Sequence, residues 1–216
     1  MEPMRTLFRL GFTTNKLLQN AEEGEMFHID LTYKIVKQSY PLLVFRNSDI
    51  VGRFHPICFM FLSHWTQCDF DLFFQNFFDL LNKKDIEINI KYPMQDADKA
   101  CLNSVQKNLP DTKSLMCFFH VMQNVRKHKH LIKDNEHYEL VKTDIRKLNK
   151  CVSKKMFENL KKKILINLSK LGLVEFRDYF VKQWLNSEFC NWSIYHTDPG
   201  MAATNNPVES FNSIIK

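Results

Sequence analysis

Residues 27–34 read FHIDLTYK, and the aspartate in this stretch, Asp30, decides how the rest of the chain is interpreted. Apolar residues precede it, and Thr32 and Tyr33 after it favour extended structure, so the segment predicts a largely buried β-strand. An ionised carboxylate inside such a strand needs a cation, a metal ion or several hydrogen-bond donors, because burial without a partner favours the neutral form. The remaining sequence has to supply that partner.

The composition is that of a folded protein. Of its 216 residues, 44% are hydrophobic and 13% aromatic. Five glycines and seven prolines, without a Ser/Gly-rich or Pro-rich tract, argue against long disordered linkers. The six cysteines are scattered without a CxxC pair, as in proteins whose thiols stay reduced. No signal peptide and no run of 18 apolar residues are visible, so we expect no membrane partner.

The charge is unevenly distributed. Residues 1–98 carry 10 Lys and Arg against 13 Asp and Glu, a net charge of −3, whereas residues 99–216 carry 20 against 11, a net charge of +9. Such asymmetry predicts a polyanionic partner, with nucleic acid the usual one. A basic helix is equally often a plain solvated surface, and charge alone leaves both readings open.

The segments that follow Asp30 predict a three-stranded antiparallel meander. PLLVF (41–45) and FHPICFMFLS (54–63) are apolar strands, and RNSDIVGR (46–53) between them has the composition of a turn. FDLFFQNFFDLLNKK (70–84) then has the apolar spacing of an amphipathic helix whose Phe-rich stripe packs on the sheet.

A fourth strand within 87–98, a helix over 99–109 and a fifth strand in 114–122 that passes into a helix continue the pattern. The resulting order, β-β-β-α-β-α-β, is that of the RNase H-like fold, an α/β class with a mixed sheet.

We expect four parts in the chain. Residues 1–25 are a lead-in segment, and residues 26–120 form the first part of the RNase H-like core. Residues 121–203 carry 16 Lys and Arg against 9 Asp and Glu, a net +7, in helical patterns, and are interpreted as an all-helical basic insertion. Residues 204–216 begin a final core helix, which we expect to be truncated.

Three acids fit the catalytic pattern of an RNase H-like core. Such a core places one carboxylate in the first strand, one at the end of the fourth and one on a late helix, here Asp30, Asp96 and Glu209. Together they would hold two divalent metal ions, Mg²⁺ or Mn²⁺, for an in-line phosphodiester displacement, because hard cations prefer oxygen ligands.

The chain also resembles the Mutator-like element (MULE) transposases. The resemblance rests on HIDLTYK (28–34), QDADKA (95–100), CFFH (117–120) and ATNNPVESFNSIIK (203–216), in that order. It implies a DNA transposase that cuts and joins strands at transposon ends in the nucleus, with Asp30, Asp96 and Glu209 as metal ligands and a homo-oligomer among its partners. Most relatives carry a zinc-binding module before the core, and residues 1–25 contain no Cys/His cluster of that kind.

Each candidate ligand also has a structural interpretation. Asp30 could be a buried acid capped by backbone donors or paired with Lys34. Asp98 competes with Asp96 as the second ligand, but it directly precedes the helix over 99–109 and is favoured as its N-cap. Glu209, at the third helical position after Asn206 and Pro207, fits a capping box.

Other residues remain open in the same way. Cys117 and His120 form a CxxH pattern that is auxiliary to the site by the resemblance; it could also be half of a zinc site completed by Cys190 or His196, or a packed Cys and a structural His. The DNA-binding candidates are Lys127, Lys129, Lys161, Lys162 and Lys163, although the last three could be a solvated helix face. Trp184 and Trp192 are interpreted as core anchors.

Three hypotheses follow. The first is an active DNA transposase core. The second is a decayed or domesticated derivative that binds DNA without catalysis, and the third is a helical interaction scaffold without a nucleic-acid role. The presence of all three acids favours the first.

Overall fold

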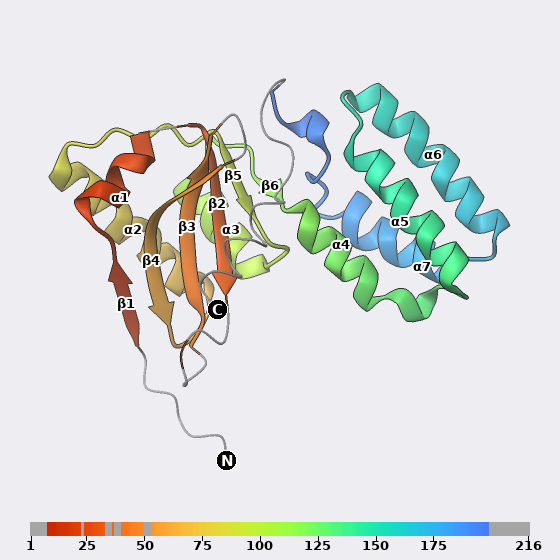
Figure 1. Cartoon of the computed structure of the whole chain (residues 1–216), viewed down its shortest axis with the longest axis horizontal. Coiled ribbons are helices and arrows are strands. Elements are labelled where there is room, and N and C mark those ends of the chain that lie inside the picture. Colours follow the sequence, from red (N-terminus) through yellow and green to blue (C-terminus); the bar gives the residue numbers. More distant parts are fainter. Residues whose placement is uncertain (1–7, 23, 33–35, 37–39, 50–52, 199–216) are drawn as a thin grey trace, which may run out of the picture. The chain divides into compact units, whose positions relative to one another are not determined.

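The computed structural model describes residues 8–22, 24–32, 36, 40–49 and 53–198 (Figure 1). These residues fall into two units, one that extends to Ser114 and one that starts at Leu115. The first unit is built on β-strands and helices. The second consists of helices and turns from residue 117 to residue 198, with no strand among these described residues.

A mixed β-sheet with the strand order β1-β4-β3-β2-β5-β6 organises the fold. β2, β3 and β4 pair antiparallel in succession, β1 pairs antiparallel with β4, and β5 pairs parallel with β2. The predicted meander and the predicted α/β class are therefore confirmed. The strands are β1 (Arg9–Phe12), β2 (Met26–Thr32), β3 (Leu42–Ser48), β4 (Phe54–Leu62), β5 (Tyr92–Gln95) and β6 (Leu115–Met116).

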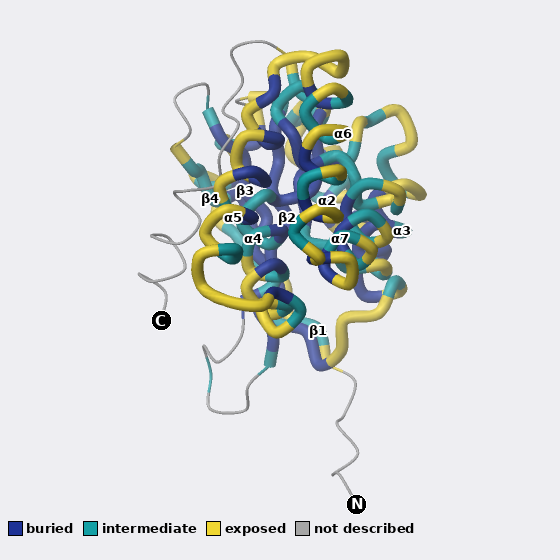
Figure 2. Tube along the Cα trace, turned by 90° about the vertical axis from the view of Figure 1, so that its right-hand side faces the viewer, coloured by how far each residue is buried: buried dark blue, intermediate teal, exposed yellow. Residues whose placement is uncertain are grey.

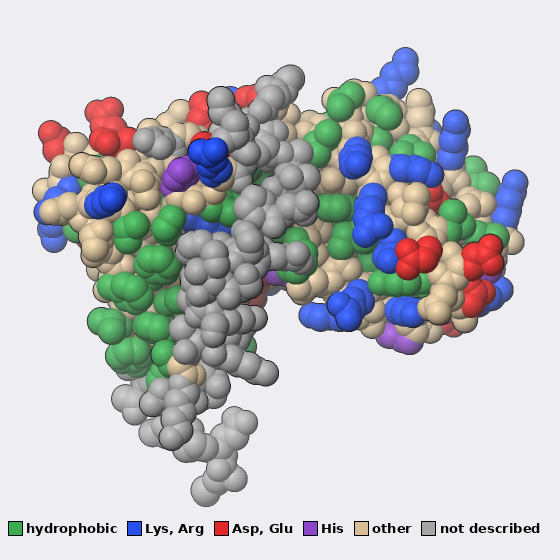
Figure 3. Space-filling model, viewed as in Figure 1, with side chains coloured by type: hydrophobic (Ala, Val, Ile, Leu, Met, Phe, Trp, Pro, Cys, Tyr) green, Lys and Arg blue, Asp and Glu red, His purple; other side chains and the backbone are tan. Residues whose placement is uncertain are grey.

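β1 is absent from the sequence-based prediction, which treats residues 1–25 as a lead-in segment. The strand is only four residues long and lies at the edge of the sheet, where one face stays open to solvent. Its outward residues Leu10 and Phe12 are 51% and 45% exposed, and the ring of Phe12 stacks on Phe59 of β4 at 5.4 Å. Apolar side chains gather on this part of the first unit (Figure 3).

The predicted turn over residues 46–53 is wrong in its first three residues. β3 continues through Arg46 to Ser48, and its seven residues are all buried (Figure 2). The polar residues Arg46, Asn47 and Ser48 suggested a turn, but pairing with β2 on one side and β4 on the other keeps them in the ladder. A central strand with neighbours on both sides overrides the local preference of its residues.

The fourth and fifth strands are shorter than predicted. β5 begins at Tyr92, and the preceding isoleucines, Ile86, Ile88 and Ile90, pack against the core from a segment without ladder pairing. Their alternation gives the sequence signal of a strand because every second side chain is half buried. β6 has two residues, and helix α4 starts immediately afterwards.

The helix α2 (Gln67–Lys84) supplies the main core against one face of the sheet. Its N-terminus is a capping box, in which the Asp69 carboxylate accepts from the backbone N–H of Thr66 at 2.8 Å. A stripe of phenylalanines at helical spacing contacts the β3 ring of Phe45, with centroid distances of 5.4 Å to Phe73 and 5.0 Å to Phe77. The predicted Phe-rich packing on the sheet is confirmed.

Three shorter helical segments complete the first unit. They are α1 (Asn15–Gln19), η1 (Asn20–Glu22) and α3 (Lys99–Asn108). α3 is tied to α2 through Asp71, whose carboxylate accepts from Ser104 Oγ at 2.6 Å and forms an ion pair with Lys107 Nζ at 2.7 Å. Asn108 Nδ2 donates to the same carboxylate at 3.0 Å.

The second unit is a set of helices around two tryptophans. Trp184 is fully buried, and the indole N–H of Trp192 donates to its carbonyl oxygen at 2.7 Å. Both tryptophans are core residues, as predicted. The segments are α4 (Phe118–Lys127), η2 (Lys129–Leu131), α5 (Asn135–Asn149), α6 (Lys154–Lys170), α7 (Val174–Phe180), the π-helical turn η3 (Val181–Leu185) and η4 (Ile194–His196).

The second unit carries the lysine-rich helices that the sequence indicates. No helix in the described part of the chain has both the length and the apolar character needed to cross a lipid bilayer.

Candidate active site

Asp30 lies in β2, a largely buried strand, as the sequence predicts, and β2 lies between β3 and β5 in the sheet. Successive side chains of a strand point to opposite faces. Phe27 and Ile29 belong to the core formed with α2, so His28 and Asp30 lie on the opposite face. Asp30 is 6% exposed. Its carboxylate is therefore buried, and the groups that face it determine what it can bind.

A cation that faces this carboxylate is Arg46 of β3. The strand register pairs Arg46 with His28, two residue pairs along the ladder from the Asp30–Val44 pair, which places the Arg46 side chain on the same face as Asp30. The guanidinium Nη2 lies 3.6 Å from Asp30 Oδ2, and Arg46 itself is only 1% exposed. The carboxylate and guanidinium thus form a buried ion pair on neighbouring strands.

The ring of Phe54, the first residue of β4, supports this ion pair. The guanidinium carbon of Arg46 lies 4.4 Å from the ring centroid, a cation–π contact. The edge of the same ring meets His28 at a centroid distance of 4.7 Å. The Arg46 side chain is therefore packed between β2 and β4, where it has little freedom to turn toward solvent.

His28 is a further polar residue on the face of β2 that carries Asp30. Its Nε2 lies 3.0 Å from Ser48 Oγ. Burial, and then the positive charge of Arg46, hold the pKa of His28 well below its ordinary value. The imidazole is therefore neutral near neutral pH, and the positive charge of this face is carried by the guanidinium.

Asp96 directly follows β5, the strand that pairs parallel with β2. The register joins Ile29 of β2 to Gln95 of β5, so Asp30 and Asp96 occupy equivalent positions one residue further along. Neighbouring strands in a sheet lie about 4.8 Å apart. The two acids are thus brought to adjacent positions at the carboxyl-terminal side of two parallel strands, a usual location of functional residues in α/β sheets.

Asp98 has the structural role that the sequence favours. It is the N-cap of α3, and its carboxylate accepts from the backbone N–H of Cys101 at 2.8 Å. The backbone N–H of Asp98 also donates to the carbonyl of Asp96 at 2.8 Å. This tight connection starts α3 and leaves Asp96 as the acid at the strand end.

Several predicted residues lie outside the described part of the chain. Glu209, the third candidate ligand, is one of them, together with Asn206 and Pro207 of its capping-box alternative. Lys34, the alternative partner of Asp30, is another. Their roles stay predictions.

Cys117 and His120 lie at the start of α4, in the second unit. Cys117 is buried at the N-cap position, and His120 follows within the first turn of the helix. Cys190 and His196 belong to the same unit, but among the described residues they do not join Cys117 and His120 in a group with metal-ligand spacing. A zinc site composed of these four residues is not formed there.

The candidate DNA-binding lysines differ in their surroundings. Lys161 of α6 pairs with Glu158 at 2.6 Å, and Lys129 donates to Asn135 Oδ1 at 2.6 Å. Lys127, Lys162 and Lys163 are exposed. Basic side chains are spread over the visible face of the second unit, together with acidic and apolar ones (Figure 3).

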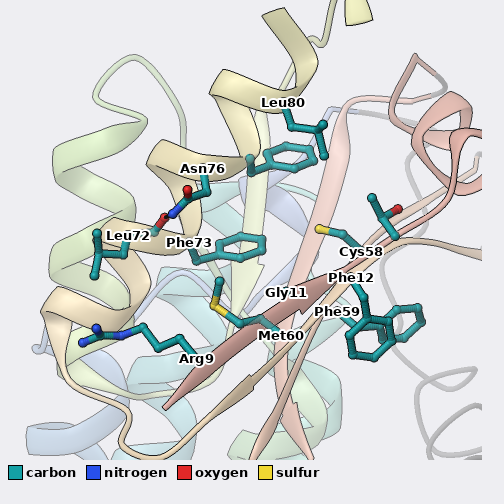
Figure 4. A pocket seen from close by; sticks show the side chains of 12 residues that line it. Arg9, Gly11, Phe12, Cys58, Phe59, Met60, Leu72, Phe73, Asn76 and Leu80 are labelled. Atoms are coloured by element: carbon teal, nitrogen blue, oxygen red, sulfur yellow. Dashed lines mark hydrogen bonds between the residues drawn. The ribbon is translucent and has the colours of Figure 1, made fainter. Parts of the chain in front are cut away.

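A cavity of about 380 Å³ lies apart from Asp30 and Asp96, between β1, β4 and α2 (Figure 4). Met60 and Cys58 of β4 face Phe73 and Leu80 of α2 across it. The lining is mostly apolar, and it includes none of the candidate ligands. The acids on the sheet are therefore a better candidate for chemistry than this cavity.

Arg46 could have been found from the sequence, because it is a charged residue directly after the buried run PLLVF. His28 had a weaker signal, as a polar residue two positions before Asp30 on the same face of a strand. In chemical terms the arrangement offers two carboxylates able to hold a hard cation, with a buried guanidinium beside one of them.

No curated protein matches the chain. A protein-family model described as the MULE transposase domain matches residues 26–124. The matched range contains β2 to β6, with Asp30 and Asp96, and most of α4. Residues 26–124 are thus similar to the MULE transposase domain, and this similarity suggests a transposase-related function.

Proposed function

We propose that the chain is the catalytic core of a DNA transposase with an RNase H-like fold, which cleaves and joins DNA strands at transposon ends. The observation that carries the proposal is the placement of Asp30 and Asp96 on adjacent parallel strands within the range similar to the MULE transposase domain. The antiparallel succession β2, β3 and β4, followed by β5 parallel to β2, supports the RNase H-like assignment.

The donor set fits divalent metal ions. Asp30 and Asp96 supply carboxylate oxygens, the ligands that Mg²⁺ and Mn²⁺ prefer, and Glu209 would supply the third by the family resemblance. When bound, two such ions activate an attacking water or 3′-hydroxyl and stabilise the leaving oxygen of the phosphodiester. β2 contributes rigidity, because Asp30 is paired with Val44 of β3 and the preceding residues of β2 are also paired with β5.

The chain's own residues would then orient the reaction. Asp30 and Asp96 would hold the metal ions that contact the scissile phosphate, and basic residues of the second unit would bind the DNA backbone. Lys162 and Lys163 are better candidates for phosphate contacts than Lys161, because Lys161 already pairs with Glu158. Phosphate contacts position DNA without reading its sequence.

The test is a nicking assay on supercoiled plasmid DNA with the full chain and Mg²⁺ or Mn²⁺. We expect metal-dependent nicking that is abolished in Asp30→Asn and in Asp96→Asn, and Glu209→Gln tests the third acid. Asp79→Asn is the matched control, because Asp79 is an exposed residue of α2. Folding of each variant is checked by circular dichroism. Nicking that survives in folded Asp30→Asn would contradict the assignment.

The second candidate is a catalytically inactive, transposase-derived DNA-binding protein. The ion pair between Arg46 and Asp30 favours it, because a guanidinium already compensates the charge of that carboxylate. This candidate predicts DNA binding with a steep salt dependence and no nicking at any Mn²⁺ concentration. Measuring binding and nicking on the same DNA therefore separates the two functions.

A further inference from the structure

The ion pair between Asp30 and Arg46 lies where the proposed function requires a metal ligand. Arg46 Nη2 is 3.6 Å from Asp30 Oδ2, and the two residues are 1% and 6% exposed. Neither charge has ready access to bulk water. The electrostatic state of Asp30 is therefore linked to the position of the Arg46 guanidinium.

The surroundings of Arg46 fix that position. β3 lies between β2 and β4, and its register with β4 is irregular between Phe45 and Arg46, so that Arg46 lies opposite Pro56. An irregularity of this kind changes the direction of the side chains next to it. The ring of Phe54, 4.4 Å from the guanidinium, covers the group further.

Buried charges of this kind depend on each other. Removing one partner of a buried ion pair leaves the other charge without compensation, which is strongly unfavourable. A divalent cation that binds Asp30 would take over its compensation and would at the same time repel the nearby guanidinium, because both carry positive charge.

We infer that Arg46 is the resident counter-cation of Asp30 and that it weakens the affinity of the Asp30 position for divalent cations. The inference rests on the proposed function in that it assigns Asp30 to metal binding. Arg46 acts through Asp30 and is a positioning residue, so its effect is to raise the metal concentration at which the site fills.

The experiment is a Mn²⁺ titration of the chelator-treated full chain by isothermal titration calorimetry. We expect Arg46→Gln to bind Mn²⁺ at least about tenfold more tightly than the wild type, because a repelling charge is removed beside the ligand. Arg46→Lys keeps the charge and stays close to the wild type. The double variant Asp30→Asn with Arg46→Gln should not show the increase in Mn²⁺ affinity, because the ligand itself is removed.

Arg53→Gln is the matched control. It removes the same charge from an exposed arginine just before β4, and its Mn²⁺ affinity should equal that of the wild type. Equal or weaker binding by Arg46→Gln would overturn the inference, and so would a similar gain in Arg53→Gln.

A second measurement covers the case in which Arg46→Gln does not fold without metal. Mn²⁺ should then restore the circular dichroism spectrum of Arg46→Gln but not that of the double variant. If Mn²⁺ does not restore the spectrum of Arg46→Gln, the inference is overturned. The proposed function is judged separately, by nicking of plasmid DNA by the wild type. If Arg46→Gln binds Mn²⁺ more tightly but the wild type does not nick DNA, the inference about Arg46 is supported and the proposed function is rejected. If the wild type nicks DNA but Arg46→Gln and the wild type bind Mn²⁺ equally, the proposed function is supported and the inference is rejected.

Discussion

Two buried aspartates in the first unit, Asp71 and Asp30, show different ways of compensating a carboxylate. Asp71 of α2 accepts from Ser104 at 2.6 Å, pairs with Lys107 at 2.7 Å and accepts from Asn108 at 3.0 Å, all from α3. Asp30 faces Arg46 at 3.6 Å, a distance longer than that of a direct hydrogen bond.

The difference indicates separate roles. Short contacts to three side chains of one helix give Asp71 a structural task, the attachment of α3 to α2. Asp30 instead faces a buried guanidinium on the neighbouring strand, so a second cation at this carboxylate would have to share it with Arg46. The same residue type is thus structural between two helices and a candidate ligand in the sheet.

The largest expected effect comes from breaking the Asp30 pair. Asp30→Asn leaves the guanidinium of Arg46 buried with a neutral neighbour and should lower the free energy of unfolding by about 3–5 kcal/mol. Adding Arg46→Gln should restore part of this loss. The measurement is urea unfolding in the presence of a chelator, and a loss below about 1 kcal/mol in Asp30→Asn would show that the two charges are not coupled.

A smaller effect is expected at Asp71. Asp71→Ala removes the acceptor of Ser104 and Asn108 and the partner of Lys107, and should lower the free energy of unfolding by about 2–3 kcal/mol. Lys107 is half exposed and keeps its hydration, which limits the loss. DNA nicking and Mn²⁺ affinity should stay at the wild-type level in the folded variant. A loss of Mn²⁺ binding would contradict the structural role of Asp71.

The sequence predicts which strands and helices form in the first unit better than it predicts the residues at which they begin and end. The strand around Asp30, the Phe-rich helix and the N-cap role of Asp98 follow from local spacing and are confirmed. The sequence does not predict β1, because a four-residue edge strand has little local signal and its pairing with β4 depends on contacts distant in sequence.

The candidate site was predictable only in part. Asp30 and Asp96 could be proposed from their positions in the chain, but their adjacency depends on the parallel register of β2 and β5. The polar run Arg-Asn-Ser-Asp predicts a turn at Arg46, whereas the pairing of β3 with β2 and β4 keeps this residue extended. Tertiary pairing decided what local composition could not.

The pH dependence of stability offers a test of the contacts that Asp71 makes. Burial raises the pKa of Asp71, and the hydrogen bonds and charge from Lys107, Ser104 and Asn108 outweigh it, so the pKa is lowered from its ordinary value of 3.8. The unfolded state then binds a proton before the folded state does as the pH falls. The stabilisation from the charged Asp71 carboxylate is complete above the pKa that Asp71 has in the unfolded state. It is lost as the pH falls through the lower pKa of the folded state.

Asp71→Asn should therefore flatten the stability profile in acid, below about pH 4. Near neutral pH the slope of the profile should be unchanged, while the variant is less stable than the wild type by a constant amount. A single group contributes a slope of at most about 1.4 kcal/mol per pH unit. The measurement is urea unfolding of both proteins at a series of pH values. Parallel profiles in acid would show that these contacts do not stabilise the charged carboxylate.

The smallest expected effect separates Asp96 from its neighbour Asp98. Asp98→Ala removes the side-chain acceptor of the Cys101 N–H at the start of α3 and should lower the free energy of unfolding by about 1 kcal/mol. Because Asp98 already caps the helix, its loss should leave nicking unchanged, whereas Asp96→Asn should abolish nicking while α3 keeps its cap. Denaturant unfolding and plasmid nicking of the two variants, measured side by side, test this division. If nicking is lost in Asp98→Ala and kept in Asp96→Asn, the ligand at the end of β5 is Asp98, and the adjacency with Asp30 given by the strand register does not define the site.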